Sequence, residues 1–179
     1  MRQLPALLRY LLRADRGQQV VEYVIVYAGV LMPVTFAIIF TAQALWVWHS
    51  VIEFARDGAH YAATHCWQAS GDNVRDYMHT HVPFTIDRDV FQNAGDDILQ
   101  IQYFSRDPDT GSLVDFACDA GECSTLCVPD VVTVRIQGYE YRHAFLTRLG
   151  LPSIVIPDFR TTLPIESAGC DPEQGACFP

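Results

Sequence analysis

The stretch from Tyr23 to Ile52 reads YVIVYAGVLMPVTFAIIFTAQALWVWHSVI and carries no Asp, Glu, Lys or Arg over 30 residues. A helix needs about 20 apolar residues to cross the hydrocarbon core of a bilayer. The stretch therefore predicts a membrane-spanning helix at about residues 23–48, within a longer helix over residues 18–66. Pro33 removes one backbone donor in the middle of the stretch, which predicts a kink in the transmembrane part.

The charge on the two sides of this stretch is unequal. Residues 1–17 hold four arginines against one aspartate, whereas residues 67–179 hold seven arginines against seventeen acidic residues. Because positive charge tends to stay on the cytoplasmic side of a membrane, we expect a single pass with a cytoplasmic N-terminus and an acidic domain outside. The formal net charge of −9 argues against a nucleic-acid partner, since binding to phosphates needs a basic face.

Six cysteines, an even number in a short chain, indicate a disulfide framework in an oxidising compartment. We favour one bridge within the tail, one between two cysteines of the loop over residues 118–127, and one from the helix end to the remaining loop cysteine. The sequence alone leaves the pairing open. The alternative is a metal site, but no Cys-x-x-Cys spacing occurs, so we expect no metal. The disulfide candidates are Cys66, Cys118, Cys123, Cys127, Cys170 and Cys177.

Residues 67–179 carry the pattern of an α+β domain with a mostly antiparallel sheet and disulfide-stapled loops. The segment from Ser70 to His81 predicts one short helix that ends before Pro83. Alternating apolar residues and turn signals predict strands at 98–105, 113–117, 131–141, 154–156 and 161–165, with a bulge at Gly138.

Small residues recur at helical spacing where the long helix leaves the apolar stretch. Ala55, Ala59 and Ala62 share one face, with Ala63 beside them. Small residues allow another backbone to approach closely. This stripe predicts packing of the helix on its own domain, packing on the helix of another subunit, or both on different faces.

The remaining candidate chemistry is sparse. His79 and His81 form a His-x-His pair without a third ligand, and we expect them to be exposed loop residues. The run Asp107-x-Asp109-x-Gly111 begins like a calcium loop but lacks its later ligands, which predicts a hairpin turn. No nucleophile elbow and no phosphate-binding glycine loop occurs. We therefore expect neither an enzyme nor a bound cofactor.

The segment before the apolar stretch has the form of a processing signal. It reads Arg16-Gly17-Gln18-Gln19-Val20-Val21-Glu22-Tyr23, a basic leader that ends in Gly with Glu-Tyr five residues later. This resembles the class III signal of type IV prepilins, and of their Flp/Tad branch in particular. The resemblance implies cleavage between Gly17 and Gln18, with Glu22 and Tyr23 as the fifth and sixth mature residues.

The resemblance continues beyond the apolar stretch. Residues 53–63, EFARDGAHYAA, look like the A-R-E/D-G-A-R-Y-A-A segment of TadE-like proteins, and residues 131–141 are similar to their V-x-V-x-V-x-x-x-Y strand. The chain thus resembles a TadE-like minor pilin, or pseudopilin, over residues 14–66 and more loosely over 130–166. The cysteine-rich loop and the tail depart from the family pattern.

The resemblance implies a pilin-like fold and a non-enzymatic role in assembly. The implied partners are a prepilin peptidase, other major and minor Tad pilins through the N-terminal helix, the assembly platform and, before assembly, the lipid bilayer. The chain would begin in the bacterial inner membrane with a periplasmic domain and end in the extracellular pilus. There it would initiate assembly or form the tip, with an implied role in surface adherence.

Glu22 has a physical role in this hypothesis. A carboxylate in lipid is costly, and pairing with a buried amine lowers that cost. The amine of a cleaved Gln18 on a neighbouring subunit would supply such a partner and would set the axial register of the helices. The alternative is that Glu22 only marks the polar boundary of an anchor and faces the headgroups.

Two other interpretations stay open. In the first, residues 1–17 are retained and the chain is a single-pass, membrane-anchored periplasmic binding or sensor domain. In the second, Ala42-Gln43-Ala44 fits the small-x-small rule of a secretory signal peptidase, which would release a soluble protein from Leu45. The apolar region before this site is longer than an ordinary signal peptide has, which argues against secretion.

Overall fold

The computed structural model describes residues 19–93, 98–142, 147–148, 150, 152–165, 167–171 and 173–177. The predicted leader and cleavage site, Gly17 and Gln18, lie outside the described residues. The chain divides into two compact units, residues 1–45 and residues 46–179. Each unit is described by itself.

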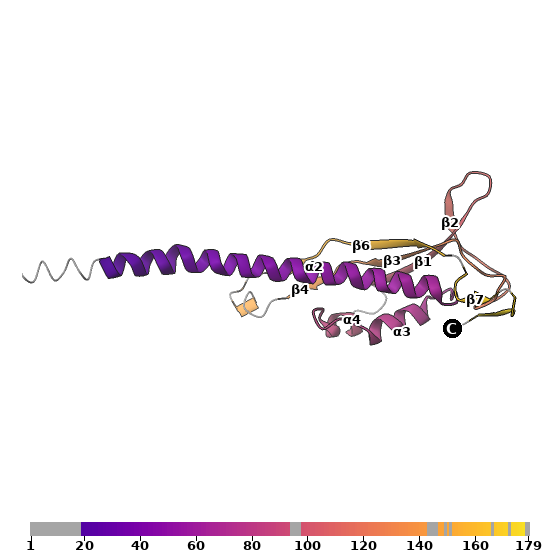
Figure 1. Ribbon diagram of the computed structural model, residues 1–179, viewed down its shortest axis with the longest axis horizontal. Helices are drawn as coiled ribbons and strands as arrows, with labels where there is room; N and C mark the ends of the chain where they lie inside the picture. The colour runs from indigo at the N-terminus through magenta and orange to yellow at the C-terminus, as the bar shows by residue number, and fades with distance from the viewer. Residues whose placement is uncertain are drawn as a thin grey trace, which may run out of the picture. The chain divides into compact units, whose positions relative to one another are not determined.

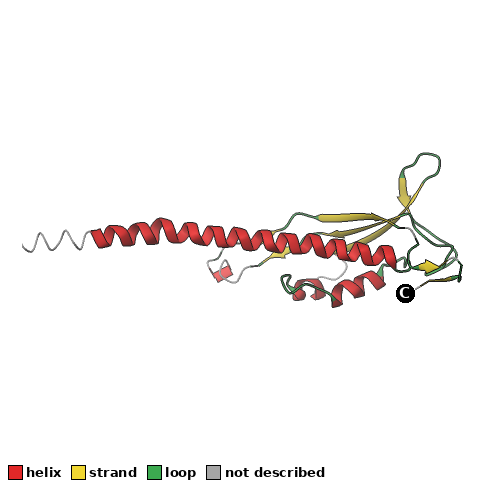
Figure 2. Cartoon of the chain, in the orientation of Figure 1, coloured by secondary structure: helices red, strands yellow, loops and turns green. Residues whose placement is uncertain are grey.

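The described part of the first unit is helical throughout. Residues 19–26 are α-helical, a π-helical turn η1 spans Tyr27–Leu31, and helix α2 begins at Met32. Helix α2 spans Met32–Thr64 and so ends in the second unit (Figure 2). The helical run from Gln19 to Thr64 is, by length and composition, the one helix of the described chain that could cross a membrane.

The helix accommodates Pro33 without breaking. Pro33 has no N–H group, so a regular helix would leave the carbonyl of Gly29 without its donor. The turn just before the proline is widened, and the N–H of Met32 donates to the carbonyl of Tyr27, five residues earlier. Such π-turns are a known way to absorb an irregular residue in a helix. The predicted kink itself stays a prediction.

The second unit is an antiparallel sheet with helices packed on one face (Figure 1). The four strands lie in the order β2-β1-β3-β6, and all neighbours are antiparallel. Two further two-stranded sheets pair β4 with β5 and β7 with β8. The bounds are α3 Asp72–Thr80, α4 Arg88–Asn93, β1 Leu99–Arg106, β2 Leu113–Asp115, β3 Val131–Ile136, β4 Glu140–Tyr141, β5 Ile154–Val155, β6 Phe159–Pro164, β7 Cys170–Asp171 and β8 Ala176–Cys177.

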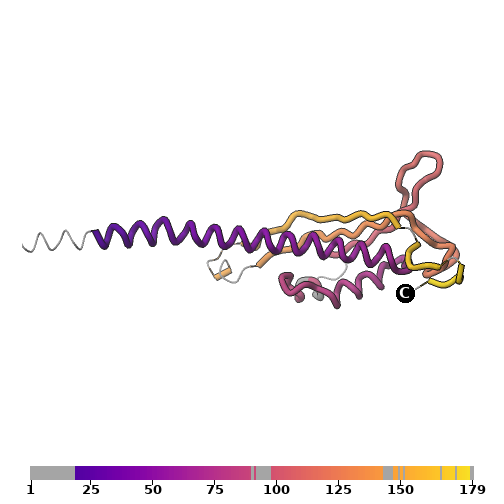
Figure 3. Tube along the Cα trace, viewed as in Figure 1, coloured from indigo at the N-terminus to yellow at the C-terminus, as the bar shows by residue number. Residues whose placement is uncertain are grey.

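The core lies between the sheet and the helices. Val132, Val134 and Ile136 of β3 alternate with more polar residues and are fully buried, as their period of two predicts. Trp48 of α2 packs edge-on against Phe159 of β6, with the ring centroids 5.0 Å apart. The sheet is built from segments far apart in the sequence, which Figure 3 shows side by side. The long helix followed by an antiparallel sheet confirms the α+β prediction.

Several local predictions can be compared with the structure. Helix α3 confirms the predicted short helix and buries Val74 and Met78. The predicted bulge at Gly138 is wrong: β3 ends at Ile136, and Gly138 has a φ of +66°. The chain then enters β4, which pairs with β5 in a different sheet. The chain therefore turns at Gly138 as it passes from one sheet to the other, and glycine adopts the left-handed conformation of this turn without a steric penalty.

Candidate functional site

The helix of the first unit presents apolar side chains to its surroundings on every side. We call residues 19–45 the exposed apolar segment. Its most apolar 18-residue window has a mean hydropathy of 2.2 and no buried residue. Ile38, for example, is 65% exposed. Monomeric soluble proteins rarely expose contiguous apolar surface of this extent. The segment therefore needs a cover of lipid or of other protein helices.

Two hydroxyl groups within this segment are satisfied locally. The hydroxyls of Thr35 and Thr41 each donate to the carbonyl oxygen four residues earlier, at 2.8 Å. Water is absent from a bilayer core, so polar groups there need internal partners. These two threonines are suited to an apolar environment.

Glu22 and Tyr23 lie in the first described turns of the helix. Both side chains are exposed, and the ring of Tyr23 stacks on that of Tyr27 with centroids 6.3 Å apart. Glu22 makes no ion pair or hydrogen bond with any residue that the structure describes. Its carboxylate is thus available for a partner outside this part of the chain.

The stripe of small residues packs inside its own domain. Ala55 and Ala59 are completely buried, Ala62 is 1% exposed, and Ala63 packs at the edge of the same core. Between them, Gly58 lies so close to Met78 of α3 that a Cβ atom there would overlap the thioether sulfur. The stripe lets α2 approach the rest of its domain. This face of α2 thus packs on its own domain, and packing of another face on a second subunit stays a prediction.

Three disulfides staple the second unit, and they follow the pairing that the sequence favoured. Cys66 joins Cys123, and so ties the end of α2 to the loop over residues 118–127. Cys118 joins Cys127 within that loop, and Cys170 joins Cys177 across the β7–β8 hairpin. The disulfides fix the loop over residues 118–127 and the β7–β8 hairpin, where Cys127 and Cys170 are the buried hydrophobic residues.

His65 and His81 lie in the same arrangement at the ends of two helices, which no expectation from the sequence included. The ends of α2 and α3 share the pattern Tyr-x-x-Thr-His, and the Nδ1 atoms of His65 and His81 each lie 2.9 Å from the carbonyl oxygen of the tyrosine four residues earlier. Tyr61 and Tyr77 stack on each other at 4.0 Å, with a histidine on either side. His79 lies within α3. The expectation that His79 and His81 are loop residues is wrong, because both belong to a helix or its cap.

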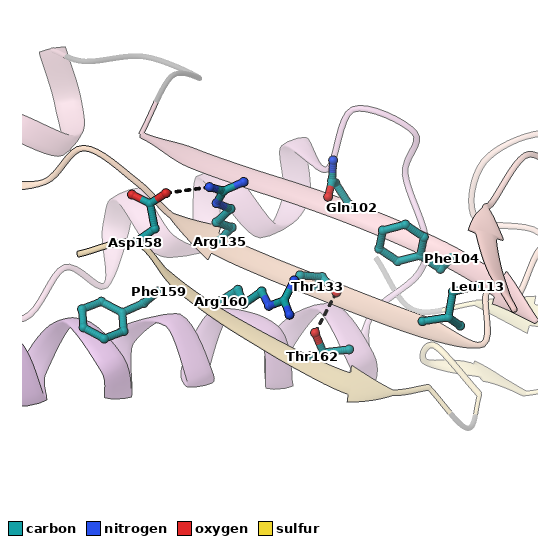
Figure 4. A pocket seen from close by; sticks show the side chains of 9 residues that line it. All are labelled: Gln102, Phe104, Leu113, Thr133, Arg135, Asp158, Phe159, Arg160 and Thr162. Atoms are coloured by element: carbon teal, nitrogen blue, oxygen red, sulfur yellow. Dashed lines mark hydrogen bonds and ion pairs between the residues drawn. The ribbon is translucent and has the colours of Figure 1, made fainter. Parts of the chain in front are cut away.

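The face of the sheet that points away from the helices carries a shallow basin of about 510 Å³. We call it the sheet basin. Strand residues of the face that points away from the helices form its floor, Asp158 and Phe159 lie at its edge where β6 begins, and Figure 4 shows all nine side chains. They are Gln102, Phe104, Leu113, Thr133, Arg135, Asp158, Phe159, Arg160 and Thr162.

Two rows of register partners cross this basin. Gln102 pairs with Thr133 and Thr133 with Thr162, and the two threonine hydroxyls are 2.9 Å apart. In the neighbouring row, Arg135 lies directly opposite Arg160. The floor therefore combines hydroxyl and amide groups with two guanidinium groups.

The two arginines differ in their partners. Arg135 donates to the carboxylate of Asp158 at 2.6 Å, and this hydrogen bond holds the pKa of Asp158 below its ordinary value. Arg160 is exposed and makes no ion pair or hydrogen bond with any other residue that the structure describes. Figure 4 shows it extended toward Thr133 and Thr162. The basin is not predictable from the sequence, because the register of β3 on β6 cannot be read from either segment alone.

The described residues contain no group of three or more His, Cys, Asp or Glu side chains that could hold a metal ion. No protein-family model, no curated protein and no solved structure matches the chain. A functional conclusion therefore rests on the sequence pattern and on the geometry of the exposed apolar segment and the sheet basin.

Proposed function

We propose that this chain is a minor pilin, or pseudopilin, of a Tad (Flp) type IVb pilus, and that its exposed apolar segment is the assembly surface. The observation that carries the proposal is the exposed apolar surface of residues 19–45, which forms the N-terminal part of a helix that leads into a disulfide-stapled α+β domain. In this function the segment lies first in the inner membrane and then among the helices of other pilins.

The positions of the buried core residues support the assignment of assembly to residues 19–45 and of a separate folded core to the second unit. The buried hydrophobic core begins at Val47 and includes no described residue before it. Residues 19–45 are thus not needed to complete the core of the second unit. These residues can therefore move from lipid to a protein environment while the second unit stays folded.

Cleavage of the N-terminus would create the contact that sets the axial register of the subunits in the fibre. A prepilin peptidase would cut between Gly17 and Gln18 and leave a free amine on Gln18. The carboxylate of Glu22 on a neighbouring subunit would pair with this amine in the apolar interior of the fibre, where an unpaired charge is costly. The absence of a partner for Glu22 within the described chain is compatible with that role. The acidic domain would stay on the surface, at a site of pilus initiation or at the tip.

A second candidate function is a single-pass, membrane-anchored periplasmic binding domain with an uncleaved N-terminus. The sheet basin favours it, because an unpaired guanidinium above a polar floor is suited to a ligand. In this function the apolar segment would remain in lipid permanently.

The experiment that separates the two uses chain recovered from native membranes and from sheared surface fibres. The proposal expects a mature mass that begins at Gln18 and recovery in both fractions. Glu22→Ala should be trimmed normally yet lost from the fibre fraction, whereas Glu53→Ala, which removes a surface carboxylate paired with Arg56 on the same helix, should assemble normally. Full-length chain in the membrane alone would contradict the proposal and support the anchored binding domain.

A further inference from the structure

The pairing of Arg135 with Arg160 runs against the ordinary rules of sheet stability. Like charges directly opposite on neighbouring strands destabilise an antiparallel pair. Ile165 donates its N–H to the carbonyl of Asp130, and hydrogen-bonded pairs alternate with open pairs along the ladder. The two arginines therefore occupy an open pair, the kind that brings side chains closest together. An unfavourable local choice of this kind is expected mainly at functional sites.

The charge of the surrounding domain makes the pair more unusual. Residues 67–179 hold seven arginines against seventeen acidic residues, and two of the seven face each other here. Asp158 neutralises Arg135, whereas Arg160 is left with no partner among the described residues. The basin thus offers one uncompensated guanidinium, whose planar donors match a carboxylate in two-point contact.

The rest of the basin indicates what should carry that carboxylate. Gln102, Thr133 and Thr162 form a row of amide and hydroxyl groups beside the guanidinium. Phe104 and Leu113 add apolar surface at one end (Figure 4). Hydroxyl-bearing edges and an apolar ring face occur together in a sugar. The chain's net charge of −9 disfavours a densely charged polymer such as nucleic acid, because long-range repulsion would oppose its approach.

We propose that the sheet basin binds a carboxylated sugar within an otherwise neutral saccharide. The carboxylate would pair with the guanidinium of Arg160, the sugar hydroxyls with the row of Gln102, Thr133 and Thr162, and the apolar ring face with Phe104. This binding site lies on the sheet and uses no residue of the exposed apolar segment. It therefore stands or falls separately from assembly into a pilus.

The test is a titration of the full chain in micelles of a detergent without a sugar headgroup, followed by calorimetry or NMR. The probes are 3′-sialyllactose and cellobiouronic acid, with lactose and cellobiose as neutral counterparts and acetate as a bare carboxylate. We expect saturable binding of at least one carboxylated probe at millimolar concentration, and binding of its neutral counterpart and of acetate that is weaker by about tenfold or more.

Variants locate the site. Arg160→Gln should weaken binding of the carboxylated probe by about tenfold, and Arg160→Lys, which keeps the charge but loses the planar donors, should weaken it less. Arg56→Gln removes another exposed arginine, on α2, and should leave binding unchanged. Thermal unfolding of each variant controls for folding. Failure of both carboxylated probes to bind, equal binding by the neutral sugars or by acetate, or unchanged binding in Arg160→Gln would overturn the proposal.

Discussion

The disulfide between Cys66 and Cys123 is expected to stabilise the second unit more than either of the other two bridges. It joins residues 57 positions apart, whereas the bridge between Cys118 and Cys127 spans 9 positions. In the loop-entropy treatment, the long bridge contributes about 4.2 kcal/mol at 25 °C and the short loop bridge about 2.6 kcal/mol. The tail bridge spans 7 positions, which corresponds to about 2.4 kcal/mol.

The variants for this prediction replace both cysteines of a bridge with alanine. Alanine is preferred to serine because Cys66 and Cys127 are buried, and a buried hydroxyl without a partner would add its own penalty. Each of these two bridges has one buried cysteine, so the pair Cys118→Ala/Cys127→Ala is a matched control for the loss of packing. The difference between the two double variants should then be about 1.6 kcal/mol, which isolates the effect of loop length.

The assay is guanidinium unfolding of the full chain in detergent micelles, followed by the near-ultraviolet circular dichroism of the aromatic core. The long-bridge variant should have the lowest unfolding midpoint of the three double variants. If all three variants lost the same stability, or if the tail variant lost the most, the chain-entropy reasoning would be refuted. A large change in the denaturant slope would show that the unfolded ensemble, rather than the folded contacts, had changed.

Three further predictions concern packing, charge and processing. Gly58→Ala should lower the free energy of unfolding by about 1 kcal/mol, because the clash with buried Met78 outweighs the gain in helix propensity; Gly29→Ala, whose Cβ would meet nothing within 4 Å, should not. Arg135 lowers the pKa of Asp158, so the ionised carboxylate stabilises the folded state at neutral pH. Asp158→Asn should therefore have a lower free energy of unfolding than the wild type at neutral pH. In parallel urea titrations this difference should disappear as the pH falls below the ordinary carboxyl range. Gly17→Ala should block trimming, so that only the full-length mass is detected; a trimmed product would contradict the predicted cleavage site.

The parts of the fold that the sequence predicts are those with a local cause. The length and apolar character of an uncharged run of 30 residues favour a helix, and the alternation in residues 131–136 places Val132, Val134 and Ile136 on the buried face. The tail bridge follows from two cysteines close together on either side of a turn. In each case the information lies within a few residues of the feature.

The parts that the sequence did not predict depend on contacts between distant segments. Arg135 and Arg160 become neighbours only through the register of β3 on β6, which no local pattern encodes. The stacked rings of Tyr61 and Tyr77 depend in the same way on how α3 folds back against α2. The repeated Tyr-x-x-Thr-His pattern was a visible signal for this second contact, because two identical helix ends indicate a shared capping geometry.

The central claim is that residues 19–45 exchange lipid neighbours for pilin helices. A photo-crosslinking residue placed at Ile38, which is 65% exposed in the middle of this segment, tests it most directly. The same residue placed at Arg56, which is exposed on the part of α2 that belongs to the second unit, serves as the control for non-specific reaction. We predict lipid adducts at position 38 in the membrane fraction and crosslinks to other pilin chains in the fibre fraction. Lipid adducts alone in every fraction that contains the chain would contradict the account.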